Sequence, residues 1–199
     1  FLSGLFFTQS LDKKGKTSFL ISKIDTIVYP YVVWSLLQGM VEVLLSRYTN
    51  NPSSLGDVLS LFTHPRAQFW FLYALFMVFV LATLLYSKEK YRYLLPVLIV
   101  ISAGLYLYQD SLTKAFHFDY ITRFLIFFLL GAFAIRYASL IANLGFGSLL
   151  ASLIAFIALQ WGFHGYSGLL YTDTGSFSLL LAVEAIFLIV SLSVLLAKT

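Results

Sequence analysis

The chain has 199 residues, of which 60% are hydrophobic and 11% charged, and its mean hydropathy is +0.88. Soluble domains carry about 25% charged residues, so this composition excludes a water-soluble fold and makes a lipid bilayer the expected surrounding. The net charge is +4, and the absence of cysteine excludes disulfides, thiolate metal sites and a cysteine nucleophile. Nothing in the sequence predicts a nucleic-acid partner.

The first element is a short apolar run, Phe1 to Phe7, followed by a polar, basic stretch from Gln9 to Lys16. The run is too short to cross a bilayer, which takes roughly 20 residues. A signal peptide would show the reverse order, with its basic residues before the apolar run. We therefore expect this run to be the end of a truncated first helix.

Six longer apolar segments follow in chain order. They are Thr26–Ser46, Phe69–Tyr86, Tyr93–Gln109, Tyr120–Arg136, Ser139–Gly162 and Phe177–Ala197. Each is continuously apolar rather than alternating, which is typical of a spanning helix and not of a barrel strand. The sequence thus predicts an all-α, polytopic transmembrane helix bundle with six full spans. We expect residues 1–199 to form a single integral-membrane domain.

The basic residues are distributed unequally between the two ends of these segments. With alternating crossings, one side receives Lys13, Lys14, Lys16, Lys23, Lys88, Lys90, Arg92, Arg136 and Lys198, and the other receives Arg47, Arg66, Lys114 and Arg123. Positive residues accumulate on the cytoplasmic side of membrane proteins. The first side, including the C-terminus, is therefore predicted to be cytoplasmic, and His64, His117 and His164 are predicted to lie outside.

The longest loop, 47–68, carries the signature of a short helix. Ser54 can cap its first turn, with Asp57 in the reciprocal position of a capping box. Val58, Leu59, Leu61 and Phe62 would give this helix an apolar face, and we expect it to lie on the outer membrane surface.

The first complete segment has one polar face. Tyr31, Ser35, Gln38 and Glu42 are spaced by four, three and four residues, with Trp34 beside them. Because a charge near the bilayer centre costs about 2.5–3.5 kcal/mol, such a face is expected to look into the bundle or a wet cavity. Alternatively, Glu42 lies close enough to the outer end to reach the headgroups.

Two other charged residues lie within apolar segments. Glu184 stands about two turns inside the last segment, where a structural partner on a neighbouring helix is as plausible as a functional role. Arg123 could pair with Glu42 or Glu184, although Asp119, four residues earlier, offers an ordinary helix-end ion pair.

A further face runs inward from the outer surface and contains Arg66, Trp70, Tyr73 and Met77. An aromatic belt at the membrane interface would also explain the aromatic residues of this face. The three histidines are each alone in their loops, so we predict no metal site.

Four stretches of the chain resemble the acyltransferase-3 family of membrane O-acyltransferases, especially the branch similar to fucose 4-O-acetylases. Phe1–Gly4 resembles the Phe-rich Ser-Gly segment that ends the family's first helix, and Ser18–Trp34 resembles its basic stretch followed by Pro-Tyr and Trp. Phe69–Leu75 resembles its Trp-Phe-Leu motif, and Phe127–Gly131 resembles a later Phe-rich helix that ends in Gly. Order and spacing agree over the first two thirds of the chain.

The resemblance implies transfer of an acyl group, usually acetyl, from cytoplasmic acetyl-CoA or another acyl-CoA to a sugar hydroxyl of a cell-surface polysaccharide or lipid-linked precursor. The resemblance also implies that the protein lies in a bacterial cytoplasmic membrane. The family's catalytic histidine would fall before Phe1, and Lys23 stands where the family often has an arginine that contacts the donor. No bound cofactor is implied.

This chemistry assigns roles to the polar residues. A hydroxyl that attacks a thioester needs a general base, a stabilised oxyanion and exclusion of water. Glu42 and Arg123 are the candidate catalytic residues. The candidate substrate-binding residues are Tyr31, Trp34, Gln38, Arg66, Trp70, Tyr73 and Glu184.

Two rival functions stay open. A transporter or flippase would use the polar face to conduct a substrate, but such proteins often show repeated halves and broken helices, and here only Pro96 and the region of Gly104 offer breaks. The chain could also be an inactive fragment, because the expected histidine is missing.

Overall fold

The computed structural model describes residues 1–46, 54–61, 65, 67–109 and 118–198, and this part of the chain is helical without strands. Four of its helices are long and apolar enough to cross a membrane: Lys16–Leu44, Phe118–Ala142, Phe146–Tyr166 and Ser176–Leu196. Two further apolar helices, Trp70–Leu85 and Tyr93–Leu107, are shorter. Each of the six predicted segments overlaps one of these helices. The prediction of an all-α membrane protein is confirmed.

The helices form two compact units. Unit 1 contains Phe1–Thr8, Arg92–Thr113 and Leu125–Thr199, and unit 2 contains Gln9–Tyr91 and Lys114–Phe124. Helix α8 (Phe118–Ala134) contributes its first turns to unit 2 and the remainder to unit 1.

Unit 2 is built around one long helix. Helix α2 (Phe7–Lys14) turns at Gly15 into α3 (Lys16–Lys23), which continues through a π-helical turn, η1 (Ile24–Val28), into α4 (Tyr29–Leu44). The π-helical turn ends two residues before Pro30, which has no N–H to donate to the preceding turn and disturbs regular α-helical bonding there. The continuous helix spans Lys16–Leu44 and so begins ten residues before the predicted segment.

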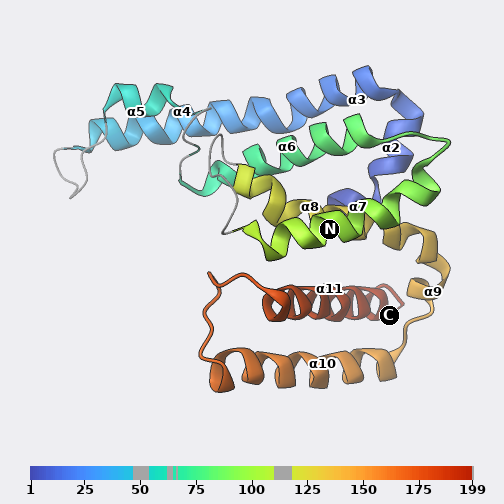
Figure 1. The fold of residues 1–199 in the computed structure, drawn as a ribbon. Coiled ribbons are helices and arrows are strands. Elements are labelled where there is room, and N and C mark those ends of the chain that lie inside the picture. The colour runs from blue at the N-terminus through green and yellow to red at the C-terminus, as the bar shows by residue number, and fades with distance from the viewer. Residues whose placement is uncertain (47–53, 62–64, 66, 110–117, 199) are drawn as a thin grey trace. The chain divides into compact units, whose positions relative to one another are not determined.

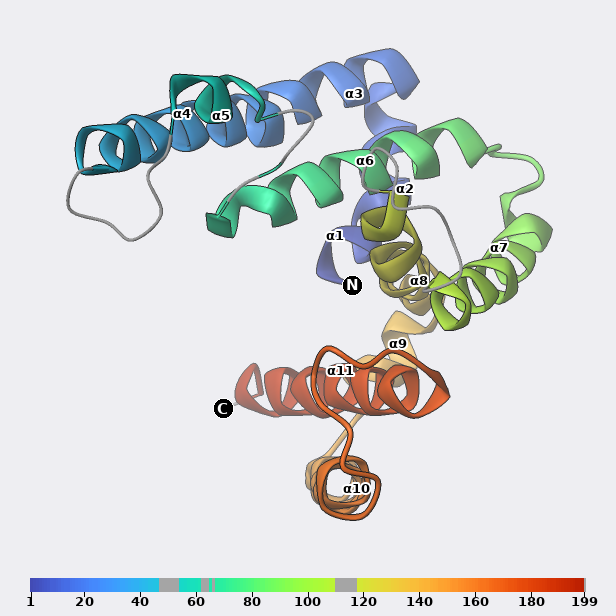
Figure 2. The same ribbon diagram turned by 60° about the vertical axis from the view of Figure 1, so that its left-hand side comes forward.

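Two further helices pack on this one. Helix α6 (Trp70–Leu85) follows the 3-10 turn η3 (Ala67–Phe69) and lies along α3 and η1 (Figure 1). The short α5 (Leu55–Leu59) lies on α4, as both ribbon views show (Figure 1, Figure 2).

The predicted capping box of α5 is present. Ser54 Oγ accepts a hydrogen bond from the Asp57 amide, and the Ser54 amide donates to Asp57 Oδ2 at 2.8 Å. Val58 is buried against α4, where Gly39 has no side chain to keep it away. Leu59, expected on the same apolar face, is instead 74% exposed, because a helix of five residues can turn only one narrow side to its neighbour.

Unit 1 contains the C-terminal helices. Its elements are α1 (Leu2–Leu5), α7 (Tyr91–Leu107), the end of α8, η6 (Ile135–Tyr137), α9 (Ala138–Ala142), α10 (Phe146–Gln160), η7 (Trp161–Tyr166) and α11 (Ser176–Leu196). Helices α10 and α11 pack together and run in opposite directions (Figure 1). The predicted continuous segment from Ser139 is wrong at its start, because Gly145 is extended and separates α9 from α10.

In unit 1, α1 and α8 approach each other closely at two glycines. A Cβ atom built on Gly4 would lie 1.9 Å from the Phe128 carbonyl oxygen, and one built on Gly131 would lie 2.1 Å from the Phe1 carbonyl oxygen. The two backbones touch directly, which only residues without a side chain permit. The T-shaped contact of Phe7 with Phe128, with ring centroids 5.2 Å apart, extends this interface.

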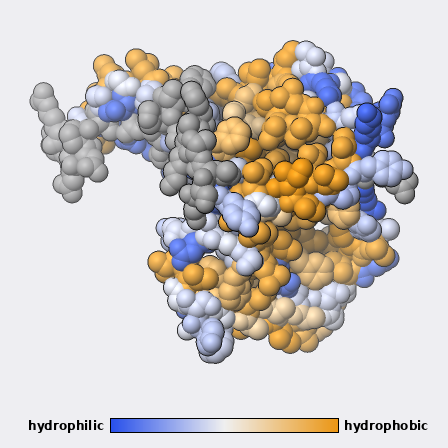
Figure 3. Space-filling model, in the orientation of Figure 1, coloured by the Kyte–Doolittle hydropathy of each residue, from blue (hydrophilic) through white to orange (hydrophobic). Residues whose placement is uncertain are grey.

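The outer surfaces of the helices are apolar. Val100 is 71% exposed and Ile154 is 61% exposed. In α11, only 6% of the most apolar 18-residue stretch is buried. The space-filling view shows hydrophobic residues over much of the visible face and hydrophilic residues gathered in patches (Figure 3). Helices with apolar side chains on all sides are expected where the surrounding solvent is lipid.

Candidate functional site

The polar face of α4 lines a small pocket in unit 2. Ser35, Gln38 and Glu42 form its polar side, and Val58, Leu61 and Phe69 are among the residues that close it. The space open to the centre of a water molecule is about 10 Å³, close to what one water or one hydroxyl group needs. This arrangement supports the cavity interpretation of the polar face over contact with headgroups.

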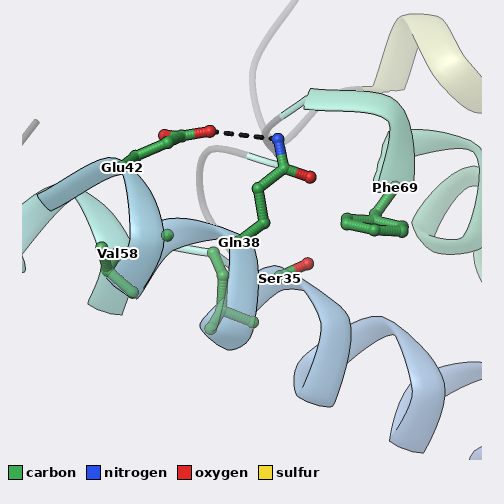
Figure 4. Close-up of a pocket in the computed structure, with 7 residues that line it drawn as sticks. Ser35, Gln38, Glu42, Val58 and Phe69 are labelled. Atoms are coloured by element: carbon green, nitrogen blue, oxygen red, sulfur yellow. Dashed lines mark hydrogen bonds between the residues drawn. The ribbon is translucent and has the colours of Figure 1, made fainter. Parts of the chain in front are cut away.

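Two side chains of the pocket are joined. Gln38 Nε2 donates a hydrogen bond of 3.0 Å to Glu42 Oε1, and Figure 4 shows the Gln38 amide turned toward that carboxylate with the ring of Phe69 on the other side. One helical turn separates the two residues, so the bond is local to α4. It orients the carboxylate at the edge of the pocket.

Tyr31 lies deeper on the same face and is 2% exposed. Its hydroxyl donates a hydrogen bond to the backbone carbonyl of Leu61, which follows α5. The phenol thus connects α4 to the segment that closes the pocket. In this structure Tyr31 positions the pocket wall, and its predicted contact with a substrate stays a prediction.

Replacing Tyr31 by Phe is expected to loosen this wall, because the Leu61 carbonyl would lose its buried donor at a cost of about 1–3 kcal/mol. Hydrogen exchange of the full-length protein should become faster in residues 54–61. Tyr29→Phe is the matched control, since Tyr29 is 67% exposed. Equal exchange in both variants would contradict the role given to Tyr31.

An aromatic cluster adjoins Tyr31. The ring of Tyr73 lies 6.0 Å from that of Tyr31 and 6.5 Å from that of Tyr120, and Trp70 lies 5.5 Å from both Tyr120 and Phe124. Three predicted binding residues are therefore brought together. Tyr120 and Phe124 also belong to the cluster but were not predicted. They lie on α8, which is distant in sequence from α6, so no local pattern indicates their contacts with Trp70 and Tyr73.

Arg123 lies one turn beyond Tyr120 on α8 and is partly buried. The expected helix-end ion pair with Asp119 is not formed among the described residues, and the same holds for an ion pair with Glu42. Arg123 Nε and Asp119 Oδ1 are both buried without a hydrogen-bond partner in the described part of the chain. A guanidinium placed in this way beside an aromatic cluster is suited to hold a ligand oxygen.

Two other predicted residues of the long helix lie away from the pocket. Trp34 is 55% exposed and is not part of the pocket lining. Lys23 places its ammonium nitrogen 5.0 Å from the centre of the Phe19 ring and 4.4 Å from that of Phe79. These cation–π contacts hold the side chain against one ring of α3 and one ring of α6, and its contact with an acyl donor stays a prediction.

Glu184 belongs to unit 1. Its Oε1 accepts a hydrogen bond of 2.9 Å from Ser152 Oγ of α10, and Ser152 is 3% exposed. This bond joins the two antiparallel helices in an otherwise apolar contact. It supplies the structural partner that was one of the two interpretations of Glu184.

Some predicted residues lie outside the described part of the chain, namely Arg66, His64 and His117. His164 lies in the π-helical turn η7, where its Nδ1 is 2.6 Å from the Leu169 carbonyl oxygen. No cluster of three or more His, Asp or Glu side chains with metal-binding geometry occurs among the described residues.

The sequence matches one protein family over its whole length. A family model described as an acyltransferase domain, that of the acyltransferase-3 family, matches residues 1–199. The chain belongs to the acyltransferase-3 family. No curated protein and no solved structure matches it significantly. The prediction of the family is confirmed, and membership supports acyl transfer in general.

Within each unit, stretches that carry the family resemblance contact each other. Gly4 and Gly131, which end two of them, form the backbone contact of α1 with α8 in unit 1. In unit 2, the stretch Phe69–Leu75 supplies Phe69 to the pocket and Trp70 and Tyr73 to the aromatic cluster.

Proposed function

We propose that this protein transfers an acyl group, in the first instance acetyl, from cytoplasmic acyl-CoA to a hydroxyl of a cell-surface polysaccharide or lipid-linked sugar. The observation that carries the proposal is a hydroxyl-sized pocket, lined by Gln38 and the Glu42 carboxylate, in a chain that the acyltransferase-3 family model matches throughout. Such a pocket suits the reacting group of the acceptor.

The proposed reaction is attack by the acceptor oxygen on the thioester carbonyl. The new carbon–oxygen bond forms, the carbon–sulfur bond breaks, and the CoA thiolate takes up the proton that a general base removes from the hydroxyl. Glu42 would orient the acceptor hydroxyl or the base. Arg123, whose Nε has no hydrogen-bond partner among the described residues, would stabilise the oxyanion.

The aromatic cluster gives the acceptor a second contact in this proposal. Trp70, Tyr73 and Tyr120 offer ring faces and hydroxyl groups in one place. Amphipathic rings of this kind bind sugars through their apolar faces while the polar groups hold hydroxyls. The same surface would also tolerate a lipid carrier.

The direct test uses membrane vesicles that contain the full-length protein, with radiolabelled acetyl-CoA and membrane saccharide extract. We expect label in the saccharide fraction that mild alkali releases, because O-acyl esters are alkali-labile. Vesicles without the protein are the control. Uptake of labelled saccharide without ester formation would contradict the proposal and support a transporter.

A further inference from the structure

Unit 2 also contains an open groove far from the polar pocket. Its lining residues come from the corner between α2 and α3 and from the end of α6, and Figure 1 shows where these helices lie. It contains about 590 Å³ of space and is lined by Asp12, Gly15, Lys16, Ser87 and Lys88, among others. Helix α6 begins at the polar pocket and ends here, and its 16 residues span roughly 24 Å. The groove is therefore separate from the proposed acyl-transfer site.

The start of α3 gives this groove a positive helix end. Gly15, with φ of 76°, is the N-cap and offers no side chain, and no side-chain cap is present. The first helical bond runs from the Phe19 amide to the Gly15 carbonyl, so the amides of the first turn have no acceptor within α3. Such a helix end carries a partial positive charge that favours an anion.

The charged side chains of the groove are mostly basic. Lys16 and Lys88 both line it and are exposed. The acidic residue in the lining is Asp12, whose Oδ1 accepts a hydrogen bond of 2.7 Å from the Tyr86 hydroxyl. Ser87 adds a hydroxyl group. Two ammonium groups, a hydroxyl and a free helix end are the groups that hold phosphate oxygens in proteins.

One wall of the groove is apolar. Leu84 and Leu85 close it on α6, and they are 67% and 38% exposed. The visible face is hydrophilic on the side where α3 begins and hydrophobic over the neighbouring helices (Figure 3). A phosphate group attached to an apolar chain satisfies both parts of this groove, whereas a fully hydrophilic anion would leave the leucines uncovered.

We propose that this groove binds the headgroup phosphate of an anionic phospholipid, with the acyl chains of the lipid along Leu84 and Leu85. The lysine-rich side is the one predicted to be cytoplasmic, and anionic lipids are concentrated in the cytoplasmic leaflet of many membranes. The bound lipid anchors the corner between α2 and α3. This inference does not depend on the proposed acyl transfer.

The test is native mass spectrometry of the purified full-length protein with equal amounts of phosphatidylglycerol and phosphatidylcholine. The double variant Lys16→Gln/Lys88→Gln should bind phosphatidylglycerol about tenfold more weakly than the unmodified protein. The control Lys13→Gln/Lys90→Gln removes the same charge from exposed residues outside the lining, and should stay within about threefold. Equal losses in both variants, or no loss in the first, would overturn the proposal.

A second part of the experiment distinguishes binding of a phospholipid from binding of a soluble phosphate compound. Inorganic phosphate and ADP, each added in excess, should leave the bound phosphatidylglycerol in place, because neither covers the leucine wall. Displacement of the lipid by ADP in the unmodified protein would overturn the lipid assignment and indicate a site for a soluble phosphorylated ligand. Circular dichroism of both double variants separates a binding loss from misfolding.

Discussion

Replacing Glu42 by Gln in the full-length protein is expected to lower acyl transfer about 100-fold at an unchanged protein level, the scale of a lost acid–base or orienting carboxylate. The substitution keeps the size of the side chain and removes its charge. The Gln38 amide would then lose a charged acceptor. The assay is the alkali-labile label transferred from acetyl-CoA.

Two variants make this result interpretable. Glu89→Gln removes the same charge from an exposed residue outside the pocket and should retain full activity. Glu42→Asp keeps a carboxylate on a shorter side chain and should retain more activity than the Gln variant. Activity of the Gln variant equal to that of Glu89→Gln would remove Glu42 from the site.

Replacing Gly131 by Ala should strongly destabilise unit 1. The added methyl group would lie 2.1 Å from a backbone carbonyl oxygen of α1, and backbone cannot move aside as a flexible side chain does. Overpacking of this kind costs about 1–3 kcal/mol and more where nothing can shift. The measurement is the thermal midpoint of the full-length protein in detergent.

The matched control for this prediction is Gly147→Ala on α10, where an added Cβ meets nothing within 4 Å. That variant should be neutral or slightly stabilised, because Ala favours a helix over Gly. Gly4→Ala should act like Gly131→Ala, and the double variant should cost less than the sum, since one contact is lost in both. Full additivity, or a stable Gly131→Ala protein, would contradict the interface.

Unit 2 contains features that depend on neighbouring residues and features that depend on distant ones. The four residues of the polar face share one side of α4 because their spacing follows the helical repeat, which is a local property. The capping box at Ser54 is equally local and was predicted correctly. In contrast, the bond from Tyr31 to Leu61 joins residues thirty positions apart, and no local pattern indicates it.

The spacing of Asp119 and Arg123 predicts an ion pair that is not formed among the described residues. Residues four apart on a helix can pair, but each side chain has other rotamers, and tertiary packing decides which of them is adopted. Among the described residues, Asp119 Oδ1 and Arg123 Nε are both buried without a hydrogen-bond partner, and Tyr120, which lies between these residues in sequence, packs on Trp70.

The amino-acid sequence by itself determined that this protein is an all-α membrane protein of the acyltransferase-3 family with a polar face on its first complete helix. Hydropathy and helical periodicity are carried by neighbouring residues, and a helix in lipid satisfies its own backbone hydrogen bonds. Only the tertiary structure decided which helix faces meet, including the contact of Gly4 with α8 and the bond of Ser152 to Glu184. In a membrane protein the lipid-facing and the buried helix faces are both apolar, so hydropathy does not distinguish them. Packing between distant segments decides which faces are buried.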